Sequence, residues 1–346
     1  MGWEVSLPTI WSMTEDTHDD MLEALGSAVR MLGPKMIVHR QDIYTKDRYH
    51  AKDSNGFLGS AYERHFDSRE HMVHRQYIFL TLAANDACAR QASDSSIFGI
   101  SSPDSRQLGK DLVALLSKAA EFESLLTSRG GYGLEWLSNE QLISLMDSHL
   151  RIHQGDGIYT DLEISGSKVK SGGRALWGYS ISKSSILPSC LTPSKRSELV
   201  SGTSSGLHAC TAAAIGPLLD CEHMVNTYIF TISQQENSRE MDGRKRRMTS
   251  MQNNAENRVG AEELAEFMDL SHKENMVCVK AHTNILVWGD ESQEQALRGK
   301  VSSALAGMSI ICVQDTFSTP VLWVSAFPGA AGEISSDNLM TRELKS

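Results

Sequence analysis

Long apolar segments are missing from this chain of 346 residues. No window of about 18 residues is continuously apolar, and the N-terminus has no basic stretch followed by an apolar one. A membrane-spanning helix needs about 20 mostly apolar residues, and a signal peptide needs both of those N-terminal regions. The sequence therefore predicts neither, and any contact with a membrane would be peripheral.

Closely spaced cysteines are also missing. Zinc sites and redox motifs usually contain C-x-x-C pairs, and disulfide frameworks are typical of short secreted chains. The scattered cysteines of this chain instead favour reduced thiols in a cytoplasmic protein. The six positions are Cys88, Cys190, Cys210, Cys221, Cys278 and Cys312.

Positive charge is sparse, because 33 Lys and Arg residues face 43 Asp and Glu residues for a formal net charge of -10. The molecule as a whole should repel DNA and anionic lipid, so any such contact needs a local basic patch. The dense basic run is Arg244, Lys245, Arg246 and Arg247. We interpret it as a solvated helix face, as most charge runs are. The alternative is an electrostatic contact with anionic lipid headgroups or DNA.

The composition is that of an ordinary globular protein, with 40% hydrophobic and 22% charged residues. The order of strand and helix patterns predicts an α+β fold. We expect two α/β-sandwich-like lobes with mixed or antiparallel sheets, joined by a helical and β-rich middle segment. The predicted ranges are a first α+β lobe (1–92), a helical segment (93–155), a β-rich connecting segment (156–219), a second α+β lobe (220–330) and a polar tail (331–346).

Helix caps and hydrophobic spacing predict the elements of the first half. Thr14 or Thr17 caps a helix that Gly33-Pro34 ends, and leucines at helical spacing predict a helix over 107–127. Ser138 and Gln141 fit a capping box at the start of a helix over 140–150. The remaining predictions are strands over 2–10, 35–44 and 75–82, a long excursion with one short helix over 45–74, and strands over 158–164, 174–182 and 198–201.

Periodicity likewise predicts the elements of the second lobe. One long polar helix should follow the strand over 226–232, and a mostly apolar strand should run over 276–288. An amphipathic helix over 292–308 and two strands, 308–313 and 321–327, should complete this lobe.

One short segment matches a hydrolase motif. Gly202-Thr203-Ser204-Ser205-Gly206 satisfies G-x-S-x-G, in which a sharp strand-to-helix turn exposes the serine hydroxyl beside backbone N–H donors. Such a match arises easily in a Ser/Gly-rich segment, so we interpret it as a plain turn. In the alternative, Ser204 is the nucleophile of a serine hydrolase, partnered by Asp220 or Asp242 and by His272 or His282.

Three histidines lie close together in the sequence. His65, His71 and His74 are interleaved with Asp67 and Glu70. A metal site needs ligands that converge on one point, yet this spacing defines no common helix face and contains no H-E-x-x-H pattern. We interpret these side chains as structural or solvated.

A phosphate-binding loop is absent from the sequence. The run 285–290 resembles a Walker B strand that ends in Asp290, but no G-x-x-x-x-G-K-[ST] loop accompanies it. We therefore expect no ATP hydrolysis by this chain. Asp290 is interpreted as the cap of the following helix.

Several segments in order resemble the N-terminal region of the TraG-type ATPases of conjugative transposons, relatives of the large ATPase of type IV secretion systems. The match at 279–288, Val-Lys-Ala-His-Thr-Asn-Ile-Leu-Val-Trp, is the closest, and the segments together span nearly the whole chain. The others are 2–8 (GWEVSLP), 38–42 (VHRQD), 48–49 (RY), 61–66 (AYERHF), 77–81 (YIFLT), 216–223 (GPLLDCEH), 301–306 (VSSALA) and 327–332 (FPGAAG).

The resemblance implies a cytoplasmic domain, peripheral at the inner membrane, that seats a motor and contacts inner-membrane components of the conjugation channel. It also implies a contribution to self-association in the DNA-transfer apparatus. Family members continue into a motor with a Walker A loop, which has no counterpart here. ATP and Mg²⁺ are therefore expected for the motor alone, and we expect no catalytic residue, cofactor, metal or small-molecule substrate in this chain.

Overall fold

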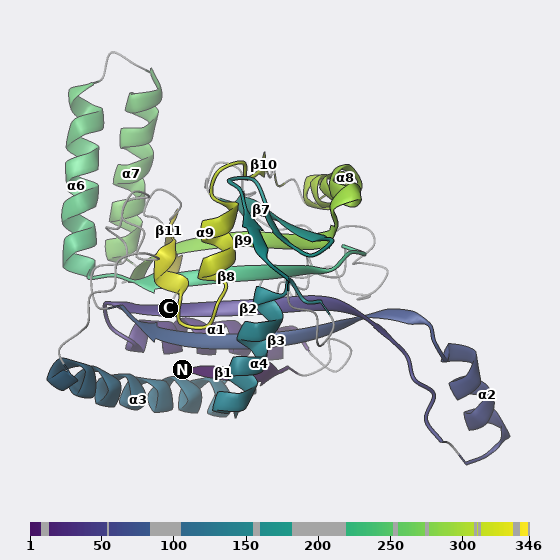
Figure 1. Cartoon of the computed structure of the whole chain (residues 1–346). Coiled ribbons are helices and arrows are strands. Elements are labelled where there is room, and N and C mark those ends of the chain that lie inside the picture. Colours follow the sequence, from purple (N-terminus) through teal and green to yellow (C-terminus); the bar gives the residue numbers. More distant parts are fainter. Residues whose placement is uncertain are drawn as a thin grey trace.

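The computed structural model shows an α+β protein with one open antiparallel sheet and helices on both of its faces, which confirms the predicted fold class (Figure 1). Among the described residues, none of the helices is both long and apolar enough to cross a bilayer. The structure describes residues 1–7, 14–53, 55–83, 105–154, 160–181, 219–251, 255–273, 277–307, 310, 313–334 and 340–344.

All strand pairs in the sheet are antiparallel, and the two predicted lobes contribute to the same sheet. The junction is the pairing of β2 with β8, in which Gln41 lies opposite Asn226. The predicted division into domains stays a prediction. In spatial order the strands are β4 (Gly133–Trp136), β1 (Gly2–Ser6), β3 (Glu70–Leu82), β2 (Met36–Arg48), β8 (His223–Thr231), β9 (Val277–Asp290), β7 (Arg174–Ile181), β6 (Val169–Ser171) and β5 (Leu162–Ile164). The short strands β10 (Val313–Gln314) and β11 (Met340–Leu344) pair with β7 and β9.

The two faces of the sheet carry different helices, because side chains alternate along each strand. On one face, Val38 and Ile78 pack with residues of α1 (Glu15–Met31) and α3 (Ser105–Ser128). Further along that face, Ile285 and Val287 pack against α8 (Glu294–Ala306), which follows a short 3-10 helix, Glu291–Gln293. On the opposite face, the core includes strand residues together with α4 (Asn139–Leu150), α9 (Thr319–Ser325) and the 3-10 helix Ala331–Glu333.

Two predicted helix caps are confirmed. The Thr14 side chain accepts a hydrogen bond from the backbone N–H of Thr17. At α4, Ser138 Oγ accepts from the Gln141 N–H at 3.2 Å, and the Gln141 side chain accepts from the Ser138 N–H at 2.8 Å. These bonds satisfy N–H groups that a helix start would otherwise leave without partners.

The expected excursion over residues 45–74, with its one short helix, is a projecting arm. Pairing of β2 with β8 stops at Tyr44, and pairing of β3 with β1 stops at Gln76. Beyond those points the two strands pair only with each other, up to Arg48 opposite Glu70. The arm, residues 45–74, ends in the short helix α2 (Phe57–Phe66), which Figure 1 shows far from the sheet at lower right.

Two secondary-structure predictions in the second lobe are wrong. The single long polar helix is a hairpin of α6 (Gln234–Ser250) and α7 (Ala255–Lys273), which stands away from the sheet in Figure 1. The expected strand over 321–327 is the helix α9, since Pro320 stands in its first turn and Leu322 and Trp323 are buried. A short apolar run fits either structure, and proline at a helix start favours the helix.

Buried amide side chains fix the register of the central strands. Gln41 Nε2 donates to Asn226 Oδ1 and Asn226 Nδ2 donates to Asn284 Oδ1, each at 3.0 Å, across β2, β8 and β9. Gln41 Nε2 also donates to the carbonyl of Ala326 at 2.8 Å. Trp323 Nε1 in turn donates to the carbonyl of His149. This row of amide hydrogen bonds therefore positions α9 against the sheet, and α9 positions the end of α4.

Candidate functional site

A polar pocket is lined by residues of α4, of the turn after it, and of β1, β2 and β3. Its volume is about 430 Å³, within the range of small-molecule sites. Three lining side chains are basic and two are acidic, in a chain of net charge -10. These are Lys46, Arg75, Arg151, Glu4 and Glu222.

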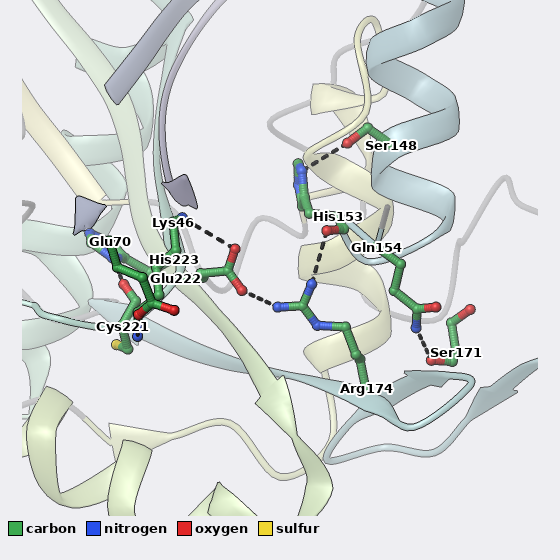
Figure 2. A network of polar contacts seen from close by, with 10 residues as sticks. All are labelled: Lys46, Glu70, Ser148, His153, Gln154, Ser171, Arg174, Cys221, Glu222 and His223. Atoms are coloured by element: carbon green, nitrogen blue, oxygen red, sulfur yellow. Dashed lines mark hydrogen bonds and ion pairs between the residues drawn. The ribbon is translucent and has the colours of Figure 1, made fainter. Parts of the chain in front are cut away.

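The wall formed by the end of α4 contains a hydrogen-bonded relay. Ser148 Oγ lies 2.9 Å from His153 Nδ1, and His149 Nδ1 lies 3.1 Å from His153 Nε2. The His153 ring also stacks on Trp288 of β9 with centroids 4.5 Å apart. Figure 2 shows the His153 ring directed at Ser148. The imidazole of His153 is therefore held on both ring nitrogens and on one face.

The backbone that carries His153 is strained. Ile152 and His153 have φ angles of 50° and 53°, in the left-handed region that side-chain-bearing residues rarely adopt. Each such residue costs about 1–3 kcal/mol, and such strain clusters at functional sites. Burial of the Ile152 side chain offsets its own cost. The left-handed turn at Ile152 and His153 places the His153 ring between Ser148 and His149.

Burial keeps both histidines of the relay neutral at neutral pH. Desolvation lowers the pKa of His149 to about 3 and the pKa of His153 well below 6.5. The neighbouring His39 adds to the first effect, and His149 and Arg174 add to the second. A hydrogen bond at the Ala326 backbone acts in the opposite direction on the pKa of His149.

Ionic contacts tie the strained turn to the sheet. Arg174 of β7 forms an ion pair with Glu222 and donates to the backbone carbonyl of His153 at 2.9 Å. Glu222 also accepts from the backbone N–H of Lys46 at 3.3 Å, and Gln154 donates to the carbonyl of Ser171. Figure 2 shows Arg174 between Glu222 and His153. Arg174, which is not among the residues that line the pocket, therefore compensates the charge of Glu222.

The hydrolase hypothesis stays a prediction, because Ser204 lies outside the described residues. Of its suggested partners, His282 is fully buried on β9, and Asp220 pairs with Lys300 at 2.9 Å. Asp242 and His272 lie on the two helices of the hairpin, α6 and α7.

The three clustered histidines lie on two elements. His65 is in α2, whereas His71 and His74 are on β3. His74 Nε2 lies 2.9 Å from Asp42 Oδ1, and its ring stacks on Tyr44. Across the described ranges, no group of three or more His, Cys, Asp or Glu side chains could hold a metal ion. His74 has a structural partner, in keeping with the interpretation from sequence.

The basic run lies on α6, in the projecting hairpin. Arg244, Arg246 and Arg247 are exposed and Lys245 is half-buried. Among the residues that the structure describes, none forms an ion pair with any of these four.

Asp290 is the cap residue before the short 3-10 helix that leads into α8, but its side chain makes no capping hydrogen bond. The expected position is confirmed, and the expected side-chain contact is absent from this described segment.

Sequence reasoning missed the relay. His149 and His153 are four residues apart, and Ser148 precedes them at a helix end, so the spacing alone could have suggested a contact. The left-handed backbone and the stacking on Trp288 depend on tertiary structure and have no sequence signal. No protein-family model matches this chain, and no curated protein matches it.

Proposed function

We propose that this chain is an assembly and docking domain of a TraG-type conjugative type IV secretion ATPase, without catalytic activity of its own. The ordered resemblance supports the family, in particular the segment 279–288 on β9. The observation that carries the docking role is the arm. In this proposal ATP and Mg²⁺ belong to the motor of the ATPase and not to this domain.

The helix at the tip of the arm exposes apolar side chains. Phe57 and Leu58 are each 82% exposed, Tyr62 is 59% exposed, and α2 has no buried residue. Large exposed apolar side chains that are clustered commonly mark interaction sites. A two-stranded ribbon that covers no core is marginal by itself, so the arm is better explained by a partner than by the stability of the fold.

Internal bonds hold the arm in a fixed shape. Tyr49 Oη donates to Glu63 Oε2 at 2.8 Å, and the same carboxylate accepts from the Lys52 N–H at 2.8 Å. The Ala51 N–H donates to Asp67 Oδ1 at 3.1 Å. These contacts fasten α2 to the chain beside it, while Phe57, Leu58 and Tyr62 stay exposed. Such preorganisation lowers the entropy lost on binding.

The partner we propose is a protein component of the conjugation channel at the inner membrane. Leu58 and Tyr62 are four residues apart and share one helix face, with Phe57 beside them. Anchors at this spacing fit an apolar groove that accepts a helix. The domain would then be cytoplasmic and peripheral at the inner membrane through that contact.

A co-purification experiment tests this proposal. The tagged chain is expressed in cells that carry the whole transfer apparatus, and bound channel components are identified by mass spectrometry. Leu58→Asp should abolish recovery of one inner-membrane component, because a charge in an apolar groove is costly. Val113→Asp on α3, which replaces another exposed apolar residue, should leave recovery unchanged. Equal recovery by both variants, or no channel component at all, would contradict the docking role.

A second candidate function is supported by the basic run on α6. Four consecutive basic residues without ion-pair partners in the described part of a projecting hairpin are available to anionic lipid headgroups or DNA.

A further inference from the structure

The projecting hairpin of α6 and α7 buries almost nothing of its own. Among its described residues only Asn237, near the start of α6, is buried, and Figure 1 shows both helices standing away from the sheet. The side chain of Met248 lies against Gly260 where the two helices meet. On α7, Val259 and Leu270 are 47% and 41% exposed. Helices in proteins are stabilised mainly by tertiary packing, so this hairpin has a surface left to cover.

The two helices carry opposite charge. α6 has basic and no acidic residues over 243–250, whereas α7 has acidic and no basic residues over 262–269. The basic strip is Arg244, Lys245, Arg246 and Arg247, and the acidic strip is Glu262, Glu263, Glu266 and Asp269, all four of them exposed. Within the described part of the chain, neither strip forms an ion pair. The strips therefore do not neutralise each other inside one hairpin.

A second copy of the same hairpin matches both strips. DNA or an anionic membrane would satisfy the basic strip and repel the acidic one. A two-fold axis that places α6 of one copy against α7 of the other does so twice, so both strips of both copies meet opposite charge. Val259 and Leu270 lie on the same face of α7 as Glu263, because they are four and seven residues from it. The same contact therefore covers these apolar side chains.

We propose that the hairpins of two copies of this chain pack into a four-helix bundle, in which the basic strip of α6 in each copy meets the acidic strip of α7 in the other. The charges select the partner and its orientation, and the apolar side chains supply buried area. This surface is separate from the docking arm, because no residue of α2 takes part. The dimer and the docking contact can therefore be tested independently.

Sedimentation equilibrium of the full chain measures the association. The parent protein should form a dimer, and its Kd should rise about tenfold from low to high salt, because salt screens exposed charges. A parent protein that stays monomeric at low salt over the whole concentration range would overturn the proposal. Binding of DNA or anionic vesicles by such a monomer would assign the basic strip to the second candidate function instead.

Charge reversal of each strip locates the interface. One variant replaces residues 244–247 by glutamate, and the other replaces the four acidic residues of the α7 strip by lysine. Each variant alone should be monomeric, because both of its strips then carry charge of the same sign. An equimolar mixture of the two variants should form a heterodimer, because every contact again joins opposite charges. The Tm of each variant reports whether it folds.

A control variant and two contrary outcomes complete the test. Asp16→Lys combined with Asp20→Lys reverses exposed charges on α1 and should leave the Kd of the dimer within about twofold of the parent value. A dimer that survives both strip reversals would use another surface and refute the proposal. Folded variants that stay monomeric when mixed would refute it as well, because loss of association without rescue does not depend on complementary charge.

Discussion

Three buried histidines predict a steep loss of stability in mild acid. His39, His149 and His223 are at most 3% exposed. Burial lowers the pKa of His39 and of His223 to about 4 and that of His149 to about 3, below the ordinary value of 6.5. The unfolded chain therefore binds more protons than the folded chain below pH 6.5. The stabilisation is complete above that pH and is lost as the pH falls toward 4.

The size of the effect follows from proton linkage. At pH 5 each of these histidines lowers the free energy of unfolding by about 2 kcal/mol relative to pH 8, and the three together by about 6 kcal/mol. A typical domain has only about 5–15 kcal/mol of stability, so this loss is a large fraction of the total. Urea unfolding at a series of pH values measures it directly.

One substitution isolates a single histidine. His223 donates from Nδ1 to the Cys221 carbonyl at 2.8 Å and stacks on Tyr44. His223→Phe keeps a ring on Tyr44 and removes the titrating group, so the stability difference between pH 8 and pH 5 should shrink by about 2 kcal/mol. Leu286→Ala in the same sheet should lower stability equally at both pH values. An unchanged pH difference in His223→Phe would refute the reasoning.

Two further predictions concern the sheet and the hairpin. Asn226→Ala should lower the free energy of unfolding by about 3 kcal/mol or more, because Gln41 and Asn284 each lose a buried partner. Urea unfolding measures this loss, with Thr227→Ala, a half-buried residue of the same strand, as the control. Equal losses in the two variants would contradict the prediction. Replacing residues 244–247 by glutamate should abolish binding of the chain to anionic vesicles or duplex DNA if α6 makes that contact, whereas neutral vesicles serve as the control. Unchanged binding in a sedimentation assay would remove the second candidate function.

The sequence predicts the elements that depend only on residues close to one another in the chain. The helix over 107–127 and the caps at Thr14 and Ser138 depend on spacing and on side chains a few residues apart, and they are confirmed. The helix α9 was mistaken for a strand because its apolar run is short. Its true state depends on contacts with the sheet, such as the hydrogen bond between Ser325 and Tyr228.

The pocket could not be predicted, because its parts are brought together by the sheet. Ser148 and His153 are close in sequence, but Arg75, Arg174 and Trp288 reach them from three different strands. The sequence gives no sign of the left-handed backbone at Ile152 and His153, since neither Ile nor His is a residue that predicts φ above zero. The arm was visible only as a break in the hydrophobic pattern, because its strands bury little.

The arm and the pocket meet at Lys46, and this decides which substitutions test the arm alone. Lys46 lies just beyond Tyr44, where β2 leaves the sheet to form the arm, and its Nζ lies 3.8 Å from Glu70 on the other arm strand. The same residue lines the pocket. A substitution of Lys46 would therefore disturb the base of the arm and the lining of the pocket together. Leu58→Asp perturbs only the arm tip, so a test of the docking proposal with that variant leaves the pocket lining unchanged.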